Sequence, residues 1–285
     1  MRPFIGSIGQ VQLSAIQSWL SLGPECQVVL VDDEEGTTPQ AVAQLDVEVI
    51  KDVKRSRLGA PLLDDLLRVG ADTARFELLA FNTADVLLPP NFVHAAVTLH
   101  QLMDGRDFFA SGSRFDLLEP VEFEIGSDGW FSVVQLAVER VGRARRHTAL
   151  DLWVYPKSLR WDAPPMPIGR GGMDGWAVWK MRTAGVSVID FSEDITLVHQ
   201  YHDRPARRDP LFHEEFLECL ELFESMAENA MGLWDADWML VNGKLQRPKG
   251  LRRVHSALSL FHPWRFLVGQ RRRMQLPHLY GQAKH

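Results

Sequence analysis

Several polar residues in this sequence have types and positions that could do chemistry, and Asp85 is the first. It ends the segment Asn82-Thr83-Ala84-Asp85, which directly follows the apolar run at 77–81. A carboxylate at the end of a buried strand can bind a divalent cation, and that cation can bind a diphosphate. Asp is also common in turns after strands, so a structural role for Asp85 is the competing interpretation.

Asp32 and Asp174 are carboxylates in two different settings. Asp32 follows the run QVVLV at 27–31, where it could accept hydrogen bonds from a ribose or a base edge. Asp174 follows the proline- and glycine-rich stretch 162–172 and precedes a helical pattern. It could act as a general base if its surroundings raise its basicity, or it could be an ordinary helix cap.

The segment His199-x-x-His202-Asp203 combines imidazole and carboxylate groups, which can bind a metal together. Two histidines three residues apart share a face only in a helix. Because a strand is expected just before them, we predict that only one of the two points at the site. The competing interpretation is a surface loop with ordinary histidines.

Arg114 and Asp151 are weaker candidates. An arginine at position 114, after Ser-Gly-Ser, could bind a diphosphate. Asp151 precedes the aromatic run LWVY. Either residue could instead belong to a structural ion pair.

Alternating apolar runs and helical patterns must position these side chains. Strands are expected at 3–6, 27–31, 47–50 and 77–81, with helices near 10–21, 39–45 and 62–74 between them. This alternation predicts an α/β fold with a mostly parallel sheet flanked by helices on both faces. Ligands bind beyond the carboxyl ends of the strands in such sheets, which is where the polar clusters lie.

The second half of the chain has a less regular pattern. Segments 108–111, 133–138 and 152–155 could be strands or short helices. Clearer patterns follow, namely a helix at 175–184, strands at 186–189 and 195–198, and a long amphipathic helix at 213–233. We therefore expect a catalytic domain at 1–204 and a helical, basic extension at 205–285.

Composition excludes several classes of protein. The chain has 285 residues, 46% of them hydrophobic, and only two cysteines, so it is neither disordered nor a disulfide scaffold. No apolar stretch reaches 18 residues, and the start does not resemble a signal peptide, which predicts a cytoplasmic protein. The net charge of −6 divides unevenly, because residues 244–285 carry ten Lys/Arg and no Asp or Glu. The remaining acidic body makes a nucleic-acid partner unexpected.

Five blocks occur in an order that resembles a known family: PFIGSIGQVQLSAIQSWLSLGPECQVVLVDDEEG, FNTADVLL, SGSRFDL, IGRGGMDGW and VIDFSEDITLVHQYHD. Together they are similar to a bacterial, viral and plant group of nucleotide-sugar glycosyltransferases of the GT-A type. The resemblance covers about residues 3–203. It implies a GT-A-like, Rossmann-like fold and transfer of a sugar from a UDP, dTDP or GDP donor to a glycan or lipid-linked acceptor.

The resemblance also implies a role for each matching residue. Asp174 would be the base of an inverting transferase, and Asp85 and His199 would bind Mn²⁺ or Mg²⁺. Thr83 stands where the family has the first Asp of its D-x-D motif. The remaining roles are donor binding and acceptor binding: Gly6, Ser7, Asp32, Ala84, Arg114 and Gly171 for the donor, and Asp151 and Trp176 for the acceptor.

Other functions remain open on the sequence alone. A metal-dependent hydrolase could use Asp85, His199, His202 and Asp203. A non-catalytic relative could bind a nucleotide or glycan without turnover. The basic segment 251–280 could pack on the acidic body, or it could make a peripheral contact with an anionic membrane at its inner face.

Overall fold

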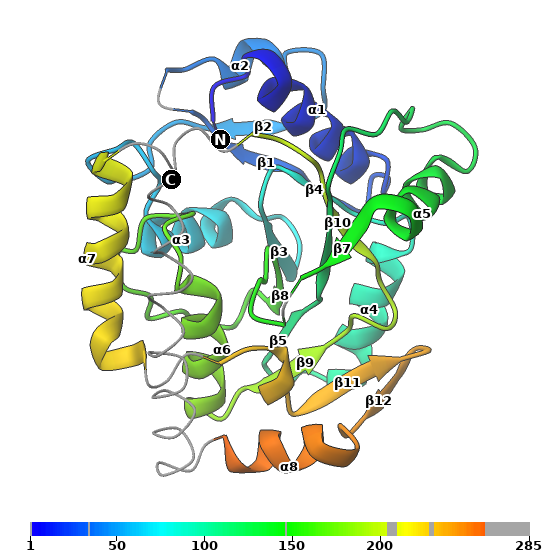
Figure 1. Ribbon diagram of the computed structural model, residues 1–285, viewed down its shortest axis with the longest axis vertical. Coiled ribbons are helices and arrows are strands. Elements are labelled where there is room, and N and C mark those ends of the chain that lie inside the picture. Colours follow the sequence, from blue (N-terminus) through cyan, green and yellow to red (C-terminus); the bar gives the residue numbers. More distant parts are fainter. Residues whose placement is uncertain (1, 34, 146, 204–209, 228–230, 260–285) are drawn as a thin grey trace.

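A computed structural model describes residues 2–33, 35–145, 147–203, 210–227 and 231–259, and it has an α/β architecture with three sheets (Figure 1). The largest sheet has six strands in the order β12-β11-β9-β5-β8-β3. In chain order its strands are β3 (Leu78–Asn82), β5 (Phe108–Ser111), β8 (Leu152–Pro156), β9 (Ser187–Asp190), β11 (Trp238–Val241) and β12 (Lys244–Gln246).

Two smaller sheets complete the arrangement. The four-stranded sheet has the order β4-β10-β6-β7 and the other sheet is the parallel pair β1-β2. Their strands are β1 (Val29–Val31), β2 (Glu48–Ile50), β4 (Val86–Leu87), β6 (Arg114–Leu117), β7 (Gly142–Ala144) and β10 (Leu197–His199).

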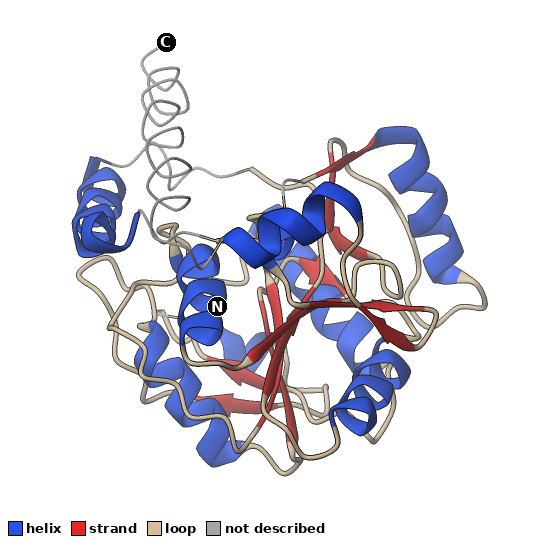
Figure 2. Ribbon diagram, turned by 90° about the horizontal axis from the view of Figure 1, so that it is seen from below, coloured by secondary structure: helices blue, strands red, loops and turns tan. Residues whose placement is uncertain are grey.

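Helices lie around the outside of the strands (Figure 2). In chain order they are α1 (Gly6–Leu20), α2 (Thr38–Ala41), α3 (Leu63–Thr73), α4 (Phe92–Met103), α5 (Trp130–Val141), α6 (Met173–Thr183), α7 (Pro210–Ala227) and α8 (Gly250–Leu258), with a short 3₁₀ turn, η2 (Leu233–Asp235), before β11. Among the described residues, no helix is long and apolar enough to cross a membrane.

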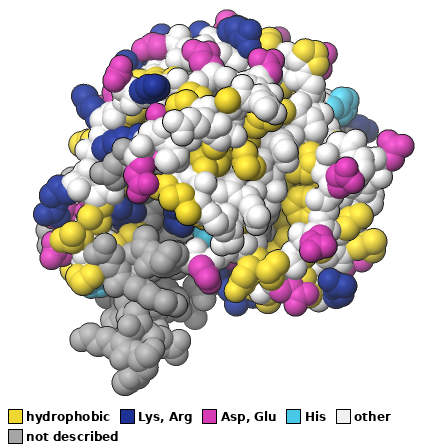
Figure 3. Space-filling view, turned by 90° about the horizontal axis from the view of Figure 1, so that it is seen from above, with side chains coloured by type: hydrophobic (Ala, Val, Ile, Leu, Met, Phe, Trp, Pro, Cys, Tyr) yellow, Lys and Arg dark blue, Asp and Glu magenta, His cyan; other side chains and the backbone are white. Residues whose placement is uncertain are grey.

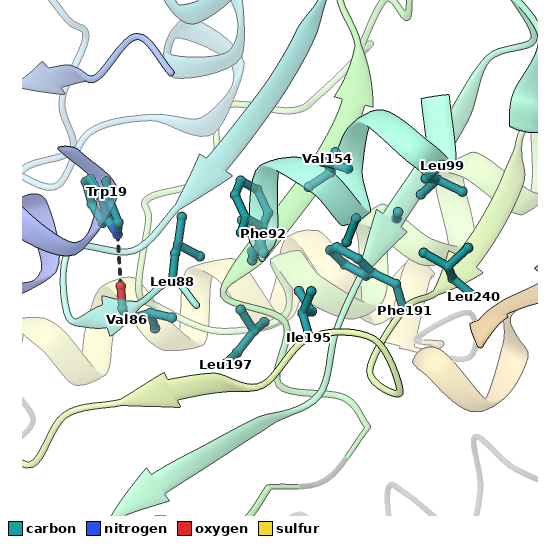
Figure 4. Packing of buried hydrophobic residues seen from close by; sticks show 14 of the residues in the cluster. Trp19, Val86, Leu88, Phe92, Leu99, Val154, Phe191, Ile195, Leu197 and Leu240 are labelled. Carbon is teal, nitrogen blue, oxygen red and sulfur yellow. Dashed lines mark hydrogen bonds between the residues drawn. The ribbon is translucent and has the colours of Figure 1, made fainter. Parts of the chain in front are cut away.

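The six-stranded sheet is covered on both faces, as expected, because its central strands bury alternate side chains in opposite directions. Leu152 and Val154 of β8 join a core that contains α1 and α4, with Trp19 of α1 donating a hydrogen bond to the Val86 carbonyl (Figure 4). Trp153 and Tyr155 join a second core with α3 and α6. A third, smaller cluster lies under α5.

The expectation of a mostly parallel sheet is wrong. Strand β9 is parallel to β5 and β11, but β8 is antiparallel to both β5 and β3, and β12 is antiparallel to β11. A continuous apolar run such as LWVY shows that both faces of a strand are covered, but it does not give the direction of the strand.

Several element boundaries also differ from expectation. Residues 3–6 form no strand, and α1 begins at Gly6. The ambiguous segment 133–138 lies within helix α5. The long helix α7 is described to Ala227, and η2 replaces the helix end expected at 233.

The C-terminal region contributes strands as well as helices. Strands β11 and β12 come from the region expected to be helical and extend the main sheet through β9. Residues 260–280 of the predicted basic segment lie outside the described part of the chain.

The face at the α1 edge is mixed in character. Figure 3 shows acidic and basic side chains interspersed around this face, with hydrophobic side chains between them.

Candidate active site

Asp85, His199 and His202 form a compact cluster. One carboxylate oxygen of Asp85, Oδ2, lies 3.3 Å from His199 Nε2 and 3.1 Å from His202 Nε2. Both imidazole side chains are nearly inaccessible to solvent, with 6% and 1% of their surfaces exposed, whereas Asp85 keeps 23%. The prediction that only one of the two histidines points at the site is therefore wrong.

Short strands bring these residues together. Strand β10 runs antiparallel to β4 and pairs His199 with Val86, the residue after Asp85 (Figure 1). The next backbone amide, that of Gln200, donates to the Asp85 carbonyl at 3.0 Å. The chain then turns so that His202 returns to the same carboxylate, an irregular path that strand periodicity does not predict.

The donor atoms of this cluster suit a divalent cation. Ligand atoms that share a first-row cation at about 2.1 Å lie roughly 3 to 3.4 Å apart. The distances from Asp85 Oδ2 to the two imidazole nitrogens fall in this range, and the three ligand atoms all lie within 4.8 Å of one another. The second Asp85 oxygen, Oδ1, is buried and has no hydrogen-bond partner among the described residues. His202 Nδ1 donates to the Asp203 carbonyl at 2.8 Å, which orients Nε2 towards Asp85.

The charge of Asp85 is maintained despite its surroundings. Burial acts to raise the pKa of this carboxyl group, but its short contacts with His199 and His202 hold that pKa well below its usual range. The group is therefore a carboxylate at neutral pH, the form that binds metal.

Arg114 lies next to this cluster and forms ion pairs with two carboxylates. Its Nε lies 2.9 Å from Asp116, and Nη1 forms a short ion pair with Asp151. Asp116 also lies 3.2 Å from Arg145 and 3.9 Å from His199 Nδ1. With only 6% of its side chain exposed, Arg114 connects the metal-binding candidates to Asp151.

Asp151 in turn connects this group to Asp174. The Asp151 carbonyl accepts a hydrogen bond from the Thr83 amide, in the turn that carries Asp85. The amide of the preceding residue, Leu150, donates to Asp174 Oδ2 at 3.2 Å. Burial, and then the charge of Asp151, raise the pKa of Asp174 to about 8. Asp174 is still partly exposed, in the first turn of α6.

The donor-side candidates lie at the neighbouring edge. Gly6 and Ser7 are exposed at the start of α1, and the preceding amide of Phe4 donates to Thr37, in the turn that follows Asp32. Helix α1 reaches the metal-binding candidates through Gln200, whose side chain donates to the Val11 carbonyl.

Asp32 itself is almost completely buried. Only 5% of it is exposed, and its carbonyl accepts a hydrogen bond from Arg55. Its neighbour Asp33 anchors the same turn, because Thr37 and Thr38 donate to its carboxylate. Nucleoside contact by Asp32 stays a prediction.

The remaining predicted site residues, Ala84, Trp176 and Gly171, pack in hydrophobic cores or against α7. Ala84 packs against the first core, and Trp176 is 3% exposed among the aromatic rings of the second core. Gly171 has a φ of +92°, and a Cβ there would lie 3.2 Å from the Phe216 ring of α7. The glycine loop is therefore in contact with α7.

Glu215 of α7 fixes this contact. It is 2% exposed, pairs with Arg170 at 2.7 Å, and accepts a hydrogen bond from the Leu58 amide at 2.9 Å. The loop at 55–59 also holds Asp32, through Arg55. One buried carboxylate thus joins the glycine loop, the loop near Asp32 and α7.

A hollow of about 480 Å³ lies elsewhere, between the start of α4, the start of α5 and the β9–β10 loop. Its lining includes Pro89, Trp130, Gln135 and Glu193, and none of the three metal-binding candidates. We therefore place the candidate chemistry at the Asp85 cluster and not in this hollow.

Asp116 and Glu215 were not predicted as members of the site, and His202 was predicted as a ligand only for the alternative metal-dependent hydrolase. Asp116 had a usable signal, because residues 114 and 116 alternate on a strand and share one face. No protein-family model matches the chain, and no curated protein resembles it closely enough to count as a match.

Proposed function

We propose that this protein is an inverting, metal-assisted glycosyltransferase that uses a nucleotide-diphosphate sugar as its donor. The observation that supports this proposal best is that a candidate cation-binding cluster and a partly exposed carboxyl group with a raised pKa belong to one network of contacts. The network runs from Asp85 through Arg114 and Asp151 to Asp174. The GT-A-like arrangement is part of this proposal, and strands β11 and β12 belong to the same sheet as the strands before residue 204.

A cation held by Asp85, His199 and His202 would neutralise the charge that develops on the departing diphosphate. Two imidazole nitrogens favour Mn²⁺ over Mg²⁺, since Mg²⁺ prefers oxygen ligands. On this proposal the buried Arg114 holds Asp151 and Asp116 in place. The cation, and not Arg114, would contact the diphosphate.

Asp174 is the proposed general base. It accepts the proton of the acceptor hydroxyl while the new bond to the sugar carbon forms and the bond to the diphosphate breaks. A base works best when its pKa lies near the working pH, which the raised pKa of about 8 satisfies. Among the described residues Asp174 has no ion pair, whereas Asp151 is paired with Arg114. A single free carboxyl group supports inversion over a double displacement.

The test is a transfer assay with Mn²⁺, a panel of UDP-, dTDP- and GDP-sugars and simple glycan acceptors, with product anomers assigned by NMR. Asp174→Asn should lower the transfer rate by about 10² to 10⁴ fold and leave donor binding unchanged. Asp162→Asn is the matched control, because its side chain is 97% exposed. Transfer by Asp174→Asn at the wild-type rate would contradict the assignment of the base.

A metal-dependent hydrolase is the second candidate, and the position of His202 favours it. Two histidines and one carboxylate also form the protein ligand set of many hydrolytic metal centres. Metal-dependent hydrolysis of esters or amides that lack a nucleotide, without any transfer, would support this alternative.

A further inference from the structure

Helix α8 is amphipathic in the opposite sense from a typical surface helix. Leu251, Val254 and Leu258 lie along its outer face and are 83%, 54% and 36% exposed. Ser256 and Ser259, on the inner face, are 6% and 3% exposed. A surface helix normally buries its apolar stripe, so these exposed side chains need an explanation.

Polar contacts fix the helix in this orientation. Arg252 pairs with Asp190 at 2.6 Å and donates to the Leu233 carbonyl, while His255 Nε2 lies 3.0 Å from Asp235. Ser256 donates to the Ala236 carbonyl at 2.9 Å.

Arg182 of α6 adds to these inner contacts. It donates to the Ser256 carbonyl at 3.0 Å and forms a short hydrogen bond with Ser259. Rolling the helix to bury its leucines would break all of these contacts, so the outward apolar stripe is a stable feature.

The exposed charged residues of α8 and of the segment 244–249 that leads to it are all basic. Lys249 and Arg253 are exposed beside the stripe, and Lys244 and Arg247 are exposed in the strand and loop that lead to it. From residue 244 to the end, the chain contains ten Lys/Arg and no acidic residue. The nearby carboxylates of Asp190 and Asp235 already pair with the inner face of the helix.

The position of α8 leaves this surface accessible to a large partner. The helix lies at the lower edge of the molecule in Figure 1, below β11 and β12, and Figure 2 shows it at the front of the view from that edge. The Asp85 cluster lies near β4 and β10, away from this edge (Figure 1).

We propose that the exposed face of α8 binds the surface of an anionic lipid bilayer. The apolar stripe would enter the boundary between headgroups and acyl chains while the flanking cations contact anionic headgroups. This inference does not depend on the proposed transferase activity.

Co-sedimentation of the full-length protein with vesicles tests the proposal. We expect binding to vesicles of phosphatidylcholine with 30% phosphatidylglycerol, and about tenfold weaker binding or less to phosphatidylcholine alone. Replacing Leu251, Val254 and Leu258 with serine should weaken binding at least about tenfold. The matched control replaces Val133 and Leu136 with serine, because these α5 residues are 47% and 64% exposed, and it should bind as wild type does.

A second variant, with Lys249 and Arg253 replaced by serine, should also bind less and should lose part of the salt sensitivity. The proposal would be overturned if the wild-type protein did not bind anionic vesicles, or if the triple-serine variant bound them as strongly as the wild type does. A third outcome would also overturn the proposal. If light scattering shows that the wild type is a dimer and the triple-serine variant a monomer, and neither binds vesicles, the apolar stripe binds a second copy of the chain.

Discussion

His202 is the residue that most changes the interpretation of the site. With Asp85 and His199 alone, the cluster would offer two ligands, and many surface pairs do as much. The third donor, oriented through the Asp203 carbonyl, makes a set that can hold a cation without substrate. Metal affinity should therefore depend strongly on His202.

We predict that His202→Gln weakens Mn²⁺ binding about 100-fold, because one of three protein ligands is lost. Isothermal titration calorimetry on metal-stripped protein measures this directly. His94→Gln, an exposed histidine of α4, is the control and should bind Mn²⁺ as wild type does. Equal affinity in His202→Gln would show that His202 is not a ligand.

The raised pKa of Asp174 should make the free energy of unfolding depend on pH. This pKa of about 8 in the folded protein exceeds the usual value of about 3.9. Between these values the native state holds a proton that the unfolded state lacks. The contribution of Asp174 to the free energy of unfolding therefore falls as pH rises from about 4 to about 8.

Asp174→Asn removes this penalty. In metal-free protein the variant should be more stable than wild type at pH 8.5, on the order of 2 kcal/mol, and nearly equal at pH 4. Urea unfolding at the two pH values measures the difference. A variant that is less stable than wild type at pH 8.5 would contradict a raised pKa for Asp174 in the folded protein.

At the scale of elements, α7 acts as a clamp on two loops. Phe216 contacts the glycine loop at Gly171, and Glu215 joins Arg170 to the Leu58 amide. The glycine loop belongs to the resembling block IGRGGMDGW, whereas the loop at 55–59 and Glu215 both lie outside the five blocks.

We predict that Glu215→Ala lowers the free energy of unfolding by about 3 kcal/mol, because it leaves a buried arginine and a backbone amide without their partner. Glu218→Ala is the control. Glu218 and its partner Arg57 are both about 60% exposed, at 58% and 61%, so its loss should cost under about 0.5 kcal/mol. Equal effects of the two changes in urea unfolding would contradict the clamp.

Element positions were more predictable than element directions. Apolar runs located β1, β2, β3, β5, β8 and β9 to within a few residues, because burial selects apolar side chains whatever the pairing. The antiparallel direction of β8 depends on its partners, β5 and β3, which lie 41 and more residues away in sequence. The strands β11 and β12 lie between helical patterns and are too short to produce a clear period of two.

In the candidate site, too, some features could be predicted from the sequence and others could not. Asp85, His199, Asp151 and Arg114 could be chosen from their residue types and their places at the ends of strands. Their mutual contacts could not, because each comes from a different element. Trp176 was chosen for acceptor binding because it lies in a resembling block, but in this structure its side chain is part of the second hydrophobic core.

At the scale of the whole molecule, the basic residues are concentrated near the C-terminal end of the sequence, whereas the residues of the candidate site lie in the acidic part. Residues 1–243 carry 21 basic and 37 acidic residues, a net charge of −16, while the remaining 42 residues carry ten positive charges. An anionic donor would approach an acidic body, so a cation at the Asp85 cluster would have to supply the attraction. Nucleotide binding by this protein should therefore depend on metal.

The most direct test of this dependence is the thermal unfolding of wild type and Asp85→Ala with UDP, dTDP and GDP, each with Mn²⁺ or with EDTA. A ligand at about 100 times its Kd adds roughly 2.7 kcal/mol to the stability of the folded state. We predict a rise in Tm for wild type with one nucleotide class and Mn²⁺, and none with EDTA or in Asp85→Ala. A nucleotide-induced rise that is the same with EDTA, or the absence of any rise with Mn²⁺, would contradict the metal-assisted transferase.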